Sequence, residues 1–251
     1  MQKIPIKLEP TPIVSAVVEI KFISSVPGEA VFGIIYPLLS KEYKKFKKLP
    51  VLQIPNDIRD RDPSLIFAPH YEFYDESKSL KILVGPKVIA IAFHKTEHNE
   101  YPGWTEYIEE EILGIYSKIF ESALIDRVTR FAIRYTDFFG SNIFENTEYK
   151  VSSKEEENLG LNEKIQFSRN FQESGFYHNI VISNNSAFKV NNKQLKGSIV
   201  DIDTYMESVE NFEDDYKKIL NECHLLNKNK FFNILKEEYV NKEFNAKYQD
   251  T

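Results

Sequence analysis

Two carboxylates in the second half of the chain have a spacing that suits chemistry. Asp201 and Asp203 lie two residues apart, in an alternating stretch that predicts a strand over 197–206. Side chains two apart on a strand point to the same face, so this pair could hold Mg²⁺ or exchange protons with a substrate. The alternative is a strand face that contacts solvent or forms ion pairs.

Two arginines share one face of a second strand, which the alternation predicts for 127–139. Arg130 and Arg134 would be ~13 Å apart along this strand, too far for both to grip one carboxylate. They could line a groove for an anionic ligand. The alternative is that each arginine pairs with an acid on a neighbouring strand, such as Glu19.

Aromatic and histidine side chains form a third set of candidates. Tyr101 and Trp104 lie at the start of a predicted helix, where they could stack on a base or a sugar, or anchor the core. His224 lies beside Cys223 in the last predicted helix. Adjacent helical residues do not face each other, so we do not expect His224 to activate Cys223 as a nucleophile. The alternative is that His224 flanks the core.

Neither a metal nor a cofactor is predicted. The segment His94–His98 matches the H-x-x-E-H pattern of zinc proteases, but that pattern needs a helix to bring the two imidazoles together. Here it follows the predicted strand Val88–Phe93 and precedes a proline and a glycine, which favours a loop. Glycine-rich phosphate-binding motifs and the nucleophile-elbow motif are missing from the sequence. We therefore assign no catalytic residue, no metal ligand and no cofactor.

Length and charge narrow the class of protein. The chain has 251 residues and a net charge of −6, from 32 basic and 38 acidic residues. This balance argues against a general binder of nucleic acids or anionic membranes. A single cysteine excludes a disulfide framework. The longest apolar runs are far below the ~18 residues of a membrane span, and the N-terminal segment has no signal-peptide pattern. We expect a cytoplasmic protein.

The hydrophobic periodicity predicts an α+β fold, with antiparallel β-sheets covered on one face by long amphipathic helices. We expect two halves of similar plan, 1–139 and 163–251, joined by a polar connection at 140–162; the halves could also pack as one domain. Two further signals are a hairpin turn at Asn184-Asn185 and a helix break at 227–229. The expected strands are 14–22, 49–54, 64–74, 80–93 (two strands around a Gly85-Pro86 turn), 127–139, 165–172, 176–183 and 197–206; the expected helices are 28–44, 104–124 and 212–245, with the basic residues 44–48 at the end of the first.

A series of short motifs along nearly the whole chain resembles a sporadically distributed bacterial protein family of unknown function. The stronger motifs are PIVSAVVEIKF (12–22), YPGWTEYIEEEILGIY (101–116) and RFAIRYTDFF (130–139). The weaker ones are IVDIDTY (199–205) and ECHLLNKNKFFNIL (222–235). The chain departs from the family pattern at Thr136-Asp137, where an asparagine is usual. The resemblance implies no reaction, and the family's patchy distribution fits phage defence or a toxin–antitoxin pair.

These observations lead to two main expectations about function. The first is a non-enzymatic protein-binding module whose acidic segments 106–111, 155–157 and 207–215 suit a basic partner. The alternative is a small-molecule sensor or an enzyme, with a cavity between sheet and helix that gathers the candidate side chains. A third possibility is a homo-oligomer that forms through sheet edges or the terminal helix.

Overall fold

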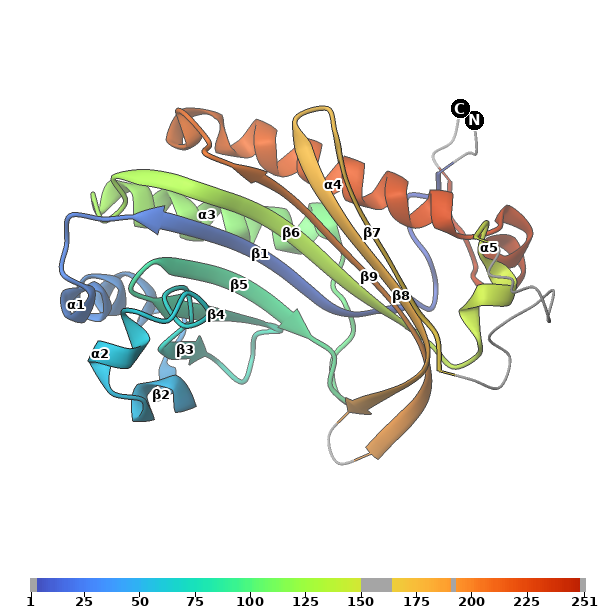
Figure 1. Ribbon diagram of the computed structural model, residues 1–251, viewed down its shortest axis with the longest axis horizontal. Coiled ribbons are helices and arrows are strands. Elements are labelled where there is room, and N and C mark those ends of the chain that lie inside the picture. The colour runs from blue at the N-terminus through green and yellow to red at the C-terminus, as the bar shows by residue number, and fades with distance from the viewer. Residues whose placement is uncertain (1–3, 150–163, 191–192, 249–251) are drawn as a thin grey trace.

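The described residues of the computed structural model, 4–149, 164–190 and 193–248, form a single nine-stranded antiparallel sheet with helices packed against it (Figure 1). The strand order is β2-β3-β4-β5-β1-β6-β9-β8-β7. The α+β class with antiparallel pairing is therefore confirmed. The strands are β1 (Ile13–Ile23), β2 (Lys45–Lys48), β3 (Tyr71–Tyr74), β4 (Leu80–Gly85), β5 (Val88–His94), β6 (Arg127–Phe139), β7 (Gln166–Glu173), β8 (Phe176–Val190) and β9 (Lys193–Glu207).

Three of the helices contribute most to the core. Buried side chains of α1, α3 and α4 pack in one cluster with the inward residues of β1, such as Val18, Ile20 and Phe22. A second cluster joins the end of α4 and α5 to β6, β8 and β9. Figure 1 shows α3 and α4 lying behind the sheet. The helices are α1 (Gly28–Leu39), α2 (Asn56–Arg59), α3 (Glu109–Glu121), α4 (Phe212–Ile234) and α5 (Glu237–Glu243), with single turns at Pro50–Gln53, Trp104–Ile108 and Ile143–Asn146.

Strict alternation on β1 and β6 sets the two faces of the sheet. On β1, Val18 and Ile20 are buried, whereas Glu19 and Lys21 lie on the opposite face. β1 pairs with β5 on one side and with β6 on the other, so it is central to the sheet. The period of two thus gives β1 one buried apolar face and one polar face.

Two predictions in the region after α1 are wrong. Lys45–Lys48 forms the edge strand β2 rather than a helix end, because it pairs with β3 and Phe46 joins an aromatic group with Phe32 and Tyr71. The expected strand 49–54 is a 3₁₀ turn that begins at Pro50. Proline lacks the N–H that a strand ladder needs, which explains this difference.

Two asparagine signals in the second half are also misleading. No hairpin turn forms at Asn184-Asn185; β8 continues through them with a register irregularity, and the Asn184 side chain accepts the backbone N–H of Ile165 at 2.7 Å. The helix α4 does not break at 227–229, because the buried Asn227 amide donates to backbone carbonyls of the sheet. Both asparagines serve tertiary hydrogen bonds instead of turns.

The predicted connection at 140–162 is described only up to residue 149. Its first part is partly buried, since Ile143 and Phe144 in the short 3₁₀ turn belong to the second core cluster. The residues 150–162 lie outside the described part of the chain. β6, from the first predicted half, pairs with β9, from the second, so one sheet spans both.

Candidate ligand cavity

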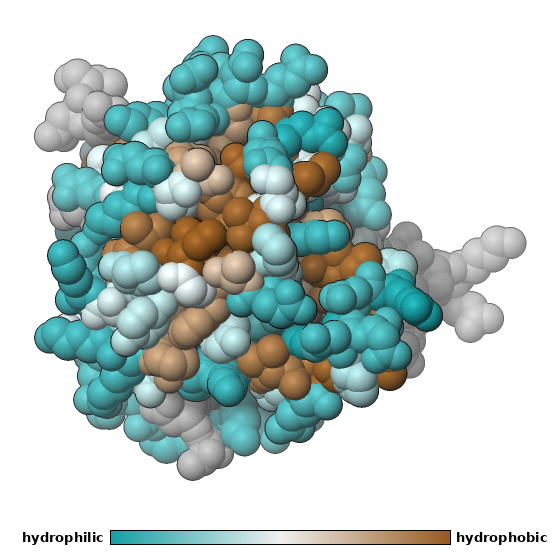
Figure 2. Space-filling view, turned by 90° about the vertical axis from the view of Figure 1, so that its left-hand side faces the viewer, coloured by the Kyte–Doolittle hydropathy of each residue, from teal (hydrophilic) through white to brown (hydrophobic). Residues whose placement is uncertain are grey.

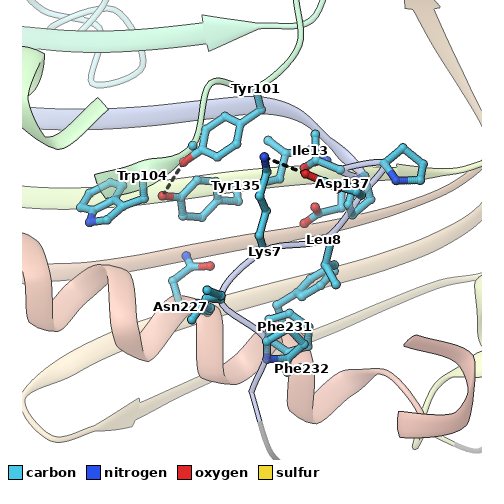
Figure 3. Close-up of a pocket in the computed structure, with 18 of the residues that line it drawn as sticks. Lys7, Leu8, Ile13, Tyr101, Trp104, Tyr135, Asp137, Asn227, Phe231 and Phe232 are labelled. Carbon is cyan, nitrogen blue, oxygen red and sulfur yellow. Dashed lines mark hydrogen bonds and ion pairs between the residues drawn. The ribbon is translucent and has the colours of Figure 1, made fainter. Parts of the chain in front are cut away.

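A cavity of about 340 Å³ lies between the sheet and α4. Its walls come from β6, α4, the segment 100–104 and the N-terminal segment 5–13, and most of its lining is apolar or aromatic. Figure 3 shows Tyr101, Trp104 and Tyr135 on one side of Lys7, and Leu8 and Asp137 on the other. The space falls within the usual size of small-molecule sites.

The N-terminal segment that covers the cavity is held by the C-terminal tail. The Ile6 N–H donates to the Lys247 carbonyl at 2.7 Å, and the Asn245 N–H donates to the Glu9 carbonyl at 2.8 Å. The Lys247 ammonium also pairs with the Glu9 carboxylate at 2.9 Å. An isolated antiparallel bridge also joins Lys7 to Lys247. The cover is therefore fixed by a few contacts at the edge of the cavity.

One end of the cavity holds a chain of aromatic polar groups. The Tyr135 hydroxyl lies 3.0 Å from Nδ1 of His224 and 3.4 Å from the Tyr101 hydroxyl. The Trp104 indole stacks on the His224 ring, with 4.0 Å between ring centroids. Burial, together with the charge of Lys228, lowers the pKa of His224 to about 3. Burial raises the pKa of Tyr135. His224 and Tyr135 are thus uncharged at neutral pH.

The other end of the cavity contains a buried carboxyl group. Asp137 of β6 is only 2% exposed, and its side chain makes no hydrogen bond or ion pair with any residue that the structure describes. Burial raises the pKa of Asp137 well above its usual value, and the charge of Asp201 adds to this effect. An unpaired carboxylate in a buried position is costly, so burial favours the neutral form of this group.

Asn227 fixes α4 beside the sheet at the cavity wall. Its amide nitrogen donates to the carbonyls of Ile133 at 3.2 Å and Ile202 at 2.9 Å. These carbonyls belong to β6 and β9, so one helical side chain bridges both strands. The contact keeps the helix and the sheet at a defined separation where the cavity opens.

The predicted site residues fall into two groups. Tyr101, Trp104 and His224 come together in the cavity. Arg130, Arg134, Asp201 and Asp203 lie on the opposite face of the sheet, because the strand alternation turns them away from α4. The structure therefore does not gather all seven in one cleft.

The second group forms an ion-pair network. Arg130 bridges Glu19 and Asp203, with both N–O distances at 2.7 Å. The Arg134 Nε donates to Asp201 at 2.9 Å. Arg130 and Arg134 thus pair with acids on adjacent strands, and Glu19 is one of these acids. A groove of about 570 Å³ runs along this face.

Sequence reasoning did not select Asp137 or Asn227. The sequence does carry a signal for Asp137, because the inward positions Phe131, Ile133 and Tyr135 continue at 137 with a period of two. A carboxyl in that inward row is the exceptional feature. For Asn227 the side-chain type suggested a break, so its role depends on tertiary contacts alone.

The remaining reactive side chains make no further site among the described residues. His94 ends β5 and lies 3.1 Å from the Ser15 hydroxyl, so the H-x-x-E-H segment is not helical. Cys223 is buried, its thiol donates to the Thr204 carbonyl at 3.2 Å, and burial raises its pKa. Within 4–149, 164–190 and 193–248, no three His, Cys, Asp or Glu side chains are grouped for a metal ion.

The chain matches no family model, no curated protein and no solved structure in the comparisons made with it. The resemblance to a sporadic bacterial family therefore stays a prediction. Among the helices in the described part of the chain, none combines the length and apolar character needed to cross a membrane.

Proposed function

We propose that this chain binds a small organic molecule in the cavity between β6 and α4. The observation that carries this proposal is the space itself, about 340 Å³ with aromatic walls and one buried carboxyl that has no hydrogen bond or ion pair to the residues that the structure describes. Apolar pockets with a few convergent polar groups are typical of small-molecule sites. The proposal includes a cytoplasmic location. It also includes the expected plan of two similar halves, with helices over one face of the sheet.

The test is calorimetric titration with a small panel of phenylalkyl compounds that carry hydroxyl, carboxylate or ammonium heads. Leu8 lines the cavity, so Leu8→Trp fills part of it, whereas Leu225 is exposed on α4 and outside the lining. We expect at least one compound to bind the wild type and Leu225→Trp, and to lose at least about tenfold in affinity for Leu8→Trp. The proposal fails if none binds at millimolar concentration, or if Leu8→Trp binds like the wild type.

A second candidate function is a protein-binding module, and an apolar surface favours it. Figure 2 views the end of the molecule that carries α1 and α2, and it shows hydrophobic side chains gathered within a hydrophilic rim. Tyr36, Phe46 and Ile58 are large hydrophobic residues that remain exposed in this region. Patches of this kind are typical of interaction sites. Phe46→Ser should then reduce the capture of a partner, while Leu195→Ser, at an exposed leucine of β9, should not.

The predicted basic partner draws support from only part of the expected acidic surface. The first acidic segment ends at Glu111 of α3, which pairs with Lys78. The second contains the start of α4, where Phe212 contacts Phe120 of α3. Glu111 and Phe120 are about 13 Å apart along the helix. The acidic segments 106–111 and 207–215 are thus separated, and 155–157 lies outside the described residues. The exposed acids that support this partner are Glu207, Glu210, Glu213, Asp214 and Asp215. A role in phage defence or a toxin–antitoxin pair, and a homo-oligomer, stay predictions.

A further inference from the structure

The Asp137 carboxyl is a buried acidic group in the cavity, and the partner that would stabilise its charge indicates the chemistry of the ligand. Asp137 lies on the inner face of β6, where it pairs in register with Ile13 of β1, and it lines the cavity together with Lys7, Leu8, Phe231 and Phe232. At 2% exposure it cannot be solvated like a surface acid. A carboxyl in such surroundings is stabilised by a cation or by strong hydrogen-bond donors. From the residues that the structure describes, no hydrogen bond or ion pair reaches the Asp137 carboxyl.

Three other charged groups that line the cavity, Lys7, Glu9 and Glu100, already have partners. Glu9 pairs with Lys7 at 2.8 Å and with Lys247, and Glu100 lies 3.8 Å from Lys95. The charge of Lys228 acts on His224 at the aromatic end. Among the described residues, no salt bridge joins Asp137 to a lysine or an arginine, and Lys7, which lines the same cavity, pairs with Glu9.

The aromatic walls of the cavity suit a ligand that combines a cation with an apolar skeleton. The rings of Tyr101, Trp104, Tyr135, Phe231 and Phe232 all line the space. Ring faces attract cations, and they also cover an apolar skeleton.

We propose that the cavity selects an organic cation, namely an ammonium group on an aromatic or alkyl skeleton, with the ammonium against Asp137 and the skeleton against the rings. This inference rests on the proposed function of the cavity and specifies the chemical class of its ligand. It predicts a coupling to pH, because the empty site favours the neutral carboxyl and the bound cation favours the carboxylate. Binding then releases a proton, so affinity should rise by up to about tenfold per pH unit below the pKa of the empty site.

The chain contains a built-in reporter for the test. Trp104 is the single tryptophan and lines the cavity, so its fluorescence follows binding in the full-length protein. The probes are 2-phenylethylamine, which is a cation at pH 7, and 2-phenylethanol, which has the same shape without the charge. The variants are Asp137→Asn and, as a matched charge change at an exposed position of α4, Asp214→Asn.

We expect the wild type and Asp214→Asn to bind the amine about tenfold or more tightly than the alcohol, as a charged hydrogen bond predicts. In Asp137→Asn this preference should fall to within about twofold, with the alcohol affinity unchanged and the thermal unfolding cooperative. Equal binding of amine and alcohol to the wild type overturns the cation proposal and leaves a neutral-ligand site. A preference that persists in Asp137→Asn also overturns it. If neither probe changes the fluorescence or the melting temperature at millimolar concentration, the proposed function fails as well.

Discussion

The inner row of β6 places a tyrosine and a carboxyl among apolar residues, and both contribute to one cavity. Tyr135 contacts His224 and Tyr101, while Asp137 occupies the next inward position. The buried environment favours the uncharged forms of these three groups, because it raises the pKa values of Tyr135 and Asp137 and lowers that of His224.

Replacement of His224 tests this charge state through stability. The folded state holds the imidazole neutral down to a pKa of about 3, whereas the unfolded chain takes up a proton near pH 6.5. Stability from this group is therefore full above pH 6.5 and is lost as the pH falls toward 3. Relative to His224→Gln, the wild type should lose roughly 2 kcal/mol between pH 7.5 and pH 5, measured by urea unfolding. Parallel pH curves for the two proteins would show that the imidazole is not held neutral.

The candidate residues illustrate what single-residue patterns can predict. Tyr101, Trp104 and His224 were selected for their chemical type, and the structure brings them together although they are far apart in sequence. The arginine and aspartate candidates share a strand face, which alternation predicts, but that face is the one away from the cavity. Periodicity tells which residues share a face; it does not tell which face a cavity opens on.

At the scale of elements, close backbone approach decides where β6 and β9 can pair. Gly197 of β9 lies so near β6 that an added Cβ would be 2.0 Å from the Phe139 carbonyl oxygen. Gly114, in the exposed part of α3, has no atom within 4 Å of such a Cβ. Gly197 is therefore required for the close approach of the two strands, whereas Gly114 only lowers the stability of the helix.

Alanine at these two glycines should have effects of opposite sign. Gly197→Ala forces the paired strands apart and should destabilise the protein by more than about 2 kcal/mol. Gly114→Ala removes the helix penalty of glycine and should stabilise it by about 0.5–1 kcal/mol. Urea unfolding at neutral pH measures both. A neutral Gly197→Ala would contradict the close β6–β9 contact.

The elements that the sequence predicted well are those with long periodic patterns. The alternation at 14–22 and 127–139 corresponds to β1 and β6, and the apolar stripe from Trp104 corresponds to the π turn and α3. The errors lie at short segments, such as Lys45–Lys48, where pairing with β3 overrides a local basic pattern. Tertiary contacts decide such segments because a few residues carry little intrinsic preference.

For the whole molecule, the continuous sheet ties the two predicted halves together. Ten residue pairs join Arg130–Phe139 of β6 to Glu207–Ser198 of β9, and α4 packs on both strands. The cavity needs the N-terminal segment, β6 and α4 at once. Neither half alone contains the complete site.

We therefore expect the chain to unfold in one cooperative transition. Trp104 fluorescence and far-ultraviolet circular dichroism should give the same midpoint in urea, as two-state behaviour requires. Residues 1–139 expressed alone leave β6 without β9 and α4, so this fragment should lack a cooperative transition. Two separate midpoints, or a fragment that melts cooperatively by itself, would show independent halves.

The most direct test of a ligand-binding cavity is native mass spectrometry of the full-length protein purified from cells that produce it. The account predicts the mass of the chain plus one small molecule that contains a basic nitrogen. The added mass should persist in Leu225→Trp and disappear in Leu8→Trp, which fills the cavity. A bare chain in every preparation, or the same added mass in Leu8→Trp, would contradict a ligand in this cavity.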